Sequence, residues 1–429
     1  MKGYIAMQRS IKINDNISLH HIPVSKLKTT TVSAFIHRPL SESEASYNAL
    51  LPHVLNRGCA LCPNMELSAK YLESLYDASF SAAGTRIGED HIMYFVGETI
   101  CDRFTPDNEP LTERLTALLL SVIFEPVIKD GAFDTEVVAQ EKNNAINRIN
   151  ALINDKRSYA SMRCQTEMCK GTPFAVSKLG TKEGIEGISA ADLYAHYKRI
   201  INSSVIDFYV SGDTDIDAVA DKIRAFTADI EFTEAAVPET AKLVKDAEVN
   251  YVTEHMDVTQ GKLAIGFRTD SVVSDKDAAA MTVFNSVFGA GAHSKLFNNV
   301  REKLSLCYYA SSQLEQFKGF CVVNAGIEFE NYQKAFDETL VQLEDIKNGR
   351  ISDLEFESSV KAIINSYNSY DDNQLAMQLY FLREKIGGTQ LDIAERIDAI
   401  KAVTKADVAN AAKKLVLDTV YFLAGKEND

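Results

Sequence analysis

The sequence has no apolar run long enough to cross a membrane. Its longest apolar stretch, residues 115–124, is about half as long as a membrane-spanning helix requires. Residues 1–16 also lack the apolar core of a secretory signal peptide. We therefore expect a cytoplasmic protein that does not engage a membrane.

An excess of positive charge is also missing. The 429 residues include 45 Lys and Arg against 60 Asp and Glu, which gives a formal net charge of −15. No basic stripe is evident along the chain, and proteins that bind nucleic acids or anionic lipids depend on such stripes. We therefore expect no nucleic-acid partner and no membrane partner.

The cysteine content argues against a disulfide framework. The seven cysteines are an odd number, scattered through a long chain. Cys59 and Cys62 form a CxxC pair, which has two functional interpretations: a redox-active pair, or half of a zinc site. The first needs a βαβ context and the second needs two more ligands at similar spacing, and neither is visible nearby. We interpret the pair as two small side chains in a loop.

A repeat divides the chain into similar halves. Ser189 with Asp192, and Thr404 with Asp407, each resemble a capping box that begins a helix, with Asp in place of Glu. Both helices lead into a short apolar strand followed by glycine. The two aspartates are 407 − 192 = 215 positions apart, half of the chain. This placement favours a duplication over chance similarity.

The chain is too long for one ordinary core, so at least two domains are expected. Strands in hairpin-like order mix with helices, which favours an α+β fold with antiparallel sheets. The small, polar and Pro-containing segment between the halves reads as a linker. We therefore predict an N-terminal domain at 1–232, a linker at 233–247 and a C-terminal domain at 248–429.

The segment from Gly289 to Ser312 carries the most informative pattern. A Gly-rich turn precedes a short helical stripe in which Leu296, Val300 and Leu304 recur every four residues. An apolar, aromatic run at 306–310 then predicts a buried strand. Arg301 would lie at the helix end and Tyr308 on the strand, with both side chains able to reach one surface. The plain alternative is that Arg301 is a solvated cation, favoured at the helix end by the helix dipole, and that Tyr308 is a core residue.

This segment resembles the second-domain signature of the pitrilysin (insulinase-like) metallopeptidases, including their short, processing-peptidase-like members. The matching residues are a Gly-rich turn, Ser-x-Leu-Phe, Arg-Glu-Lys and Leu-x-Tyr, over some twenty positions. The resemblance implies two tandem domains of similar fold, each a mostly antiparallel sheet with helices on one face. It also implies that Arg301 and Tyr308 hold the backbone of a bound peptide.

The family's zinc motif, His-x-x-Glu-His on a first-domain helix, is broken in this sequence. Ala49 stands at the first His, Pro52 at the Glu that serves as general base, and only His53 remains. Glu141 corresponds to the downstream Glu ligand, at a longer spacing. One His and one Glu do not make an open zinc site. We therefore expect no metal and no catalytic residue on this chain, with His53 an ordinary histidine that is either on the helix surface or partly buried, and Glu141 solvated.

An intact second-domain motif and a broken zinc motif together resemble the non-catalytic member of bacterial two-chain peptidases. We expect a peptide-binding subunit of a heterodimer, inactive alone, whose homologous partner carries the zinc. The alternatives are a structural scaffold of the same fold, or an autonomous peptidase with an unorthodox site. Retention of Arg301 and Tyr308 favours the peptide-binding subunit, because a scaffold has no need of them.

Overall fold

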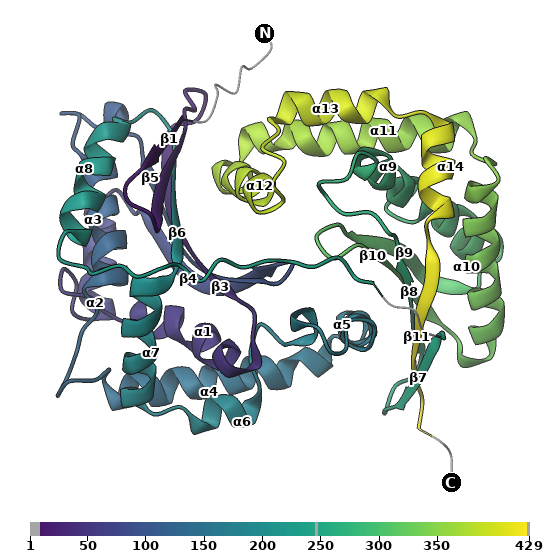
Figure 1. Ribbon diagram of the computed structural model, residues 1–429, viewed down its shortest axis with the longest axis horizontal. Helices are drawn as coiled ribbons and strands as arrows, with labels where there is room; N and C mark the ends of the chain where they lie inside the picture. The colour runs from purple at the N-terminus through teal and green to yellow at the C-terminus, as the bar shows by residue number, and fades with distance from the viewer. Residues whose placement is uncertain (1–8, 245–247, 427–429) are drawn as a thin grey trace. The chain divides into compact units, whose positions relative to one another are not determined.

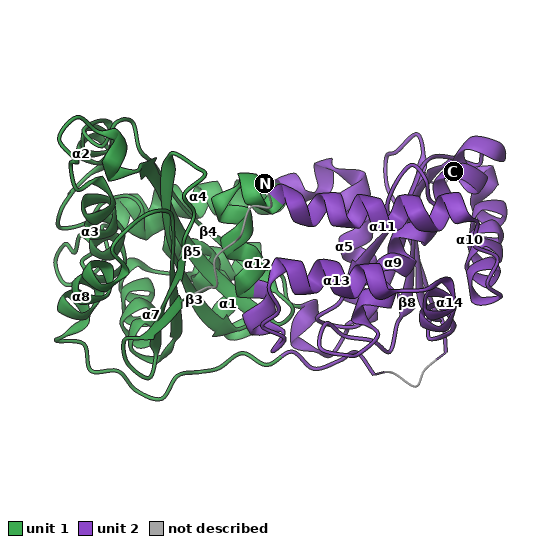
Figure 2. Cartoon of the chain, turned by 90° about the horizontal axis from the view of Figure 1, so that it is seen from above, with its two compact units in different colours: residues 1–150, 176–239, 370–382 green, residues 151–175, 240–369, 383–429 purple. Residues whose placement is uncertain are grey.

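The computed structural model describes residues 9–244 and 248–426 (Figure 1). The chain forms two compact units, coloured separately in Figure 2. Unit 1 contains the residues up to Asn150, Val176–Glu239 and Tyr370–Leu382. Unit 2 contains Ala151–Ala175, Thr240–Ser369 and the residues from Arg383 onward. The first unit therefore includes a late segment of the chain, and the second includes an early one.

Unit 1 is built on a six-stranded sheet with the order β1-β2-β6-β3-β5-β4. Only the β2–β6 pair is parallel, and the other neighbours are antiparallel. The strands are β1 Arg9–Lys12, β2 Ile17–Ile22, β3 Thr29–Pro39, β4 Ser79–Ile87, β5 Asp90–Ile100 and β6 Val205–Ser211.

Helices cover one face of this sheet and form the larger core of unit 1. Along β3, Val32, Ala34 and Ile36 face this core, because alternate residues of a strand point to opposite faces. Leu119 of α3 and Ile200 of α7 pack in the same cluster. The helices are α1 Glu42–Leu55, α2 Met65–Glu73, α3 Leu111–Phe124, α4 Thr135–Ala151, α6 Lys182–Gly187, α7 Ala190–Ser203 and α8 Ile216–Thr227.

Unit 2 repeats this plan with a five-stranded sheet of order β7-β11-β8-β10-β9. Its strands are β7 Asn250–His255, β8 Gly261–Arg268, β9 Cys307–Glu315, β10 Phe320–Ile327 and β11 Val416–Ala424. Its core-side helices are α9 Ala278–Phe288, α10 Tyr332–Lys347, α11 Asp353–Asn368, α13 Ile393–Ala402 and α14 Lys405–Lys413. A π-helical segment, η4 Leu296–Lys303, precedes β9. Short 3₁₀ turns lie at η1 Asp102–Phe104, η2 Leu152–Asn154, η3 Pro173–Ala175, η5 Phe329–Asn331 and η6 Ser369–Asp372.

The second face of each sheet receives a helix from the opposite half of the sequence. Helix α5, Lys156–Met168, packs on β8, β10 and β11 of unit 2. Helix α12, Gln374–Ile386, begins in unit 1, where Gln374 and Gln378 bond to β3. Nothing in the local sequence of either helix indicates that it packs on the sheet of the other half.

The predicted α+β class with mostly antiparallel sheets is confirmed. Both predicted capping boxes are also present, at Ser189 with Asp192 and at Thr404 with Asp407. The chain passes from unit 1 to unit 2 at Glu239 and Thr240, and the predicted linker ends in residues 245–247, which lie outside the described residues. No helix within 9–244 and 248–426 is long and apolar enough to span a bilayer.

Candidate functional site

The helix that carries Arg301 is π-helical. Leu304 N–H donates to Asn299 O at 3.1 Å, a bond to the fifth residue back. Leu296 and Val300 of the predicted apolar stripe are buried, but Leu304 is 45% exposed. The extra residue in a π turn explains this difference, because a four-residue spacing no longer keeps Leu304 above Val300. Such turns occur often at functional sites.

Tyr308 occupies a β-bulge at the start of β9. Tyr309 pairs with Gly326 and Cys307 pairs with Ile327, so Tyr308 is the extra residue between them. Its side chain is 53% exposed. The interpretation of Tyr308 as a core residue is therefore wrong, because a bulge bends the strand and redirects a side chain that regular pairing would have placed otherwise.

Arg301 and Tyr308 line one pocket of about 360 Å³ in unit 2. The Arg301 guanidinium lies 4.6 Å from the centre of the Phe297 ring, and its Nε is 3.4 Å from Glu302 Oε1. The Tyr308 hydroxyl donates to the Glu328 carboxylate, and this bond raises the pKa of the tyrosine. The sequence thus anticipated that both residues would reach one surface, and their role in binding peptide stays a prediction.

The helix that corresponds to the family's zinc helix, α1, offers almost no ligand. Ala49 has no donor atom, and Pro52 is buried inside the helix. His53 is half-buried, which agrees with the second of the two alternatives, and burial followed by the Arg148 charge lowers its pKa. A single imidazole is therefore the only remnant of the motif on this helix.

Glu141 was predicted to be solvated, and that prediction is wrong. It is only 5% exposed, and both of its carboxylate oxygens are bonded. Oε1 accepts from Arg57 Nη1 at 3.1 Å, and Oε2 accepts from Asn144 Nδ2 at 3.2 Å. The difference arises because Arg57, just beyond α1, lies against α4 and supplies a fixed cation. This carboxylate is paired rather than available to a metal.

The residues present do not fit a zinc ion at this position. Within the described part of the chain, no group of three or more His, Cys, Asp or Glu side chains is placed to hold a metal. A catalytic zinc needs three protein ligands and an open position. Here the ligand positions are occupied by an alanine, one histidine of lowered pKa and an ion-paired glutamate.

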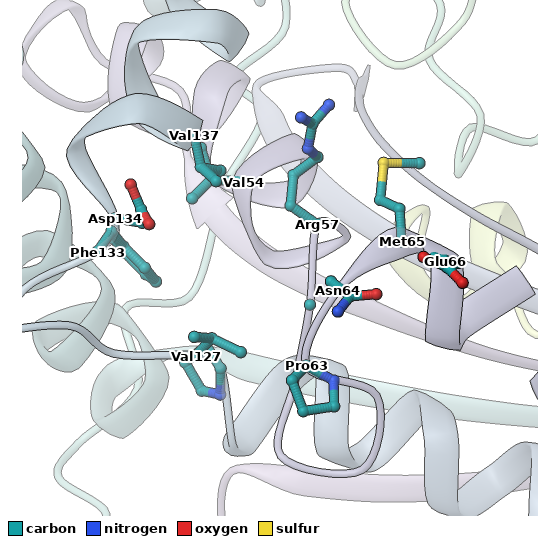
Figure 3. Close-up of a pocket in the computed structure, with 12 residues that line it drawn as sticks. Val54, Arg57, Pro63, Asn64, Met65, Glu66, Val127, Phe133, Asp134 and Val137 are labelled. Carbon is teal, nitrogen blue, oxygen red and sulfur yellow. The ribbon is translucent and has the colours of Figure 1, made fainter.

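Sequence reasoning missed a second pocket, of about 450 Å³, beside the end of α1 (Figure 3). Figure 3 shows Val54 and Val137 on one side of it, and Asn64 and Met65 on the other. The loop before α2 that helps to form it contains the CxxC pair. Cys59 N–H donates to Cys62 O at 2.9 Å, and both thiols are free and buried. Burial raises the pKa of Cys62, which disfavours the reactive thiolate.

Comparisons with known proteins agree with this geometry. Residues 187–363 match the family model described as "Peptidase M16 inactive domain". The chain is 35% identical over 411 residues to the "Probable inactive metalloprotease YmfF" of Bacillus subtilis, and the alignment covers 96% of each chain. A conserved protein from Enterococcus faecalis V583 has a similar structure, with a TM-score of 0.90 at 28% identity over 99% of this chain and 100% of that one.

A crystal structure of a peptidase M16 inactive domain from Pseudomonas fluorescens shares the fold, with a TM-score of 0.79. Its sequence is 14% identical, and the match covers 99% of this chain and 98% of that one. The resemblance to pitrilysin-like enzymes is therefore confirmed. The broken zinc motif and these relatives lead to one conclusion: the chain belongs to the M16 metallopeptidase family, as an inactive homologue.

Proposed function

We propose that this chain is a non-catalytic subunit that binds an extended peptide and presents it to a homologous, zinc-bearing peptidase chain. The observation that carries the proposal is the contrast between its two motifs. Arg301 and Tyr308 converge on one open pocket, whereas Ala49, Pro52 and the Glu141–Arg57 pair leave no metal site. A cytoplasmic location completes the proposal.

The pocket suits a peptide backbone for a chemical reason. A guanidinium carries five N–H donors, and the hydrogen bond that it donates to a peptide carbonyl is charge-assisted. The Phe297 ring supports the flat side of Arg301, which limits the rotamers that it loses on binding. Glu328 fixes the direction of the Tyr308 phenol. Both groups are therefore oriented before a peptide arrives.

The test is peptide hydrolysis by this chain mixed with its zinc-bearing partner. The partner is to be identified as a chain that copurifies with this one and carries His-x-x-Glu-His. Arg301→Ala should lower kcat/KM roughly tenfold to a hundredfold, because a hydrogen bond to a charged group contributes about 1.5–3 kcal/mol. Tyr308→Phe should lower it roughly twofold to tenfold, because a hydrogen bond between neutral groups contributes about 0.5–1.5 kcal/mol. Complex formation, followed by gel filtration, should be unchanged, since both side chains are exposed at the pocket.

Lys303→Ala is a matched control, since it removes a cation from the same π-helical turn but does not line the pocket. Unchanged hydrolysis in the Arg301→Ala/Tyr308→Phe double variant would contradict peptide holding and favour a structural scaffold. Hydrolysis by the isolated chain, with tightly bound zinc that is lost in His53→Ala, would contradict the non-catalytic assignment.

A further inference from the structure

Two cations of unit 2 lie against one aromatic ring. The Cζ of Arg157, from the first turn of α5, is 4.2 Å from the centre of the Tyr309 ring. The Nζ of Lys262, on β8, is 5.9 Å from the same centre. The ring itself lies close over Gly326, where an added Cβ would come within 2.4 Å of its Cε1. Glycine therefore lets the ring lie flat on the sheet, with both cations beside it.

No ion pair within 4 Å joins either cation to an acidic side chain in the part of the chain that the structure describes, and the one carboxylate whose charge acts on Arg157 is that of Asp155. Arg157 Nη2 donates to Ser311 Oγ at 2.9 Å, and Lys262 Nζ donates to Gln260 Oε1 at 3.2 Å. Both acceptors are uncharged. The nearby Asp155 is committed to capping α5, where it accepts from two backbone N–H groups and a serine hydroxyl.

The electrostatics of this group favour an anion. Burial lowers the pKa of Lys262 and raises the pKa of Tyr309 to about 12, so the phenol supplies no counter-charge at neutral pH. Two positive charges beside one ring repel each other, and a bound anion would remove this repulsion. Arg157 also keeps donors beyond the one used by Ser311, in the planar fork that matches a carboxylate.

The cations adjoin the pocket proposed to hold the peptide. Gln260, which accepts from Lys262, also lies within hydrogen-bonding reach of the Tyr308 hydroxyl. Tyr308 and Tyr309 are consecutive residues, separated in register by the bulge. A peptide bonded at Tyr308 would therefore have a neighbouring group close to Arg157 and Lys262.

We propose that Arg157 and Lys262, arranged around Tyr309, form a subsite for a peptide carboxylate, supplied either by an acidic side chain or by the free C-terminus. This inference rests on the proposed peptide-binding function and names the chemistry of the peptide. The subsite requires that a peptide reach the α5-bearing face of the unit 2 sheet.

The experiment uses the immobilised full-length chain and a synthetic library of random decapeptides, made once with free C-termini and once with C-terminal amides. Bound peptides are identified by mass spectrometry. The test variant is Arg157→Gln/Lys262→Gln. The control, Lys334→Gln/Lys361→Gln, removes two exposed charges from α10 and α11, on the other face of the sheet. Arg301→Ala/Tyr308→Phe reports on the proposed function itself.

The wild-type chain and the control should enrich carboxylate-bearing peptides, and the test variant should lose this enrichment by roughly tenfold. Enrichment that survives in the amide library assigns the carboxylate to acidic side chains, and enrichment that disappears there assigns it to the C-terminus. Binding that depends on Arg301 and Tyr308 without preference for carboxylates overturns the subsite alone. A preference retained in the test variant overturns it as well. Failure of the wild-type chain to retain any peptide overturns the proposed function together with the subsite.

Discussion

The second faces of the two sheets have the same architecture and different chemistry. On unit 1, α12 is held by amides: Gln378 accepts from Ser33 Oγ at 2.6 Å and donates to Ser211 Oγ at 2.6 Å. On unit 2, α5 combines close packing with a charged contact. A Cβ added to Gly266 would lie 2.1 Å from Met168 Sδ, and Tyr159 and Arg163 of the helix both donate to Glu254 of β7. A duplicated framework can therefore keep a helix in place either with amide hydrogen bonds or with close packing joined to an ion pair.

The polar character of the unit 1 face extends beyond α12 to a buried charge network. His37 lies between two carboxylates, with Nδ1 2.6 Å from Asp90 Oδ2 and Nε2 3.4 Å from Asp207 Oδ2. His20 contacts Asp207 at 3.1 Å. Although burial opposes the charge, the two carboxylates outweigh it and raise the pKa of His37 to about 9.

Removing the histidine should have the largest effect on stability. We expect His37→Gln to lower the free energy of unfolding of unit 1 by about 3–5 kcal/mol, because it leaves buried carboxylates without their cation. Urea denaturation measures the loss, and hydrogen exchange should locate it in β3 and β5. Adding Asp90→Asn should recover part of it. A variant as stable as the wild type would show that the network carries no net charge pairing.

Truncating the buried Met168 side chain on unit 2 should have the next largest effect on stability. Met168 is 1% exposed, and Met168→Ala should cost about 2–5 kcal/mol, since it removes buried methylenes and leaves a cavity. Hydrogen exchange should rise in β8 and β11 but not in β3. Exchange that instead rises equally in both sheets would contradict the separation of the two units' cores.

Removing hydrogen bonds under α12 should have a smaller effect. Gln378→Leu leaves the hydroxyls of Ser33 and Ser211 and a β3 carbonyl without their partner, at an expected cost of about 1–3 kcal/mol. Gln333→Leu makes the same change on the exposed side of α10 and should be nearly neutral. Equal stability of the two variants would mean that packing, not hydrogen bonding, holds α12.

The smallest expected effect is that of changing the pH by a single unit. The pKa of His37 is raised on folding, so its stabilising contribution is complete below its unfolded value of 6.5 and disappears as pH rises through about 9. Stability of unit 1 should therefore fall by about 1 kcal/mol per pH unit within this window. The difference in the free energy of unfolding between wild type and His37→Gln, measured at several pH values, isolates the contribution of His37 ionisation. A difference that stays constant from pH 6 to 10 would refute the assigned pKa.

Local features were predictable from the sequence, because local physics determines them. Ser189 and Thr404 cap helices through residues three positions away. The approach of Arg301 and Tyr308 to one pocket follows from a turn only a few residues long. The linker at 233–247 stays a prediction, and limited proteolysis should cut there first.

The missed features depend on partners far away in the sequence. Glu141 is buried because Arg57, 84 positions away, reaches its carboxylate. The bulge at Tyr308 depends on its register with Gly326 on the neighbouring strand. The exchange of α5 and α12 depends on sheets formed by the other half of the chain. Periodicity and propensity carry no information about such partners.

The exchanged helix α12 also sets a lower limit on how soon the protein can finish folding on the ribosome. Thr31 and its partner Gln374 are 343 positions apart. At synthesis rates of about 5–20 residues per second, roughly 17–70 s separate the two. During that interval the nascent first half must wait with a polar, hydroxyl-rich sheet surface instead of an apolar one, and a water-compatible surface is the safer one to leave uncovered during translation.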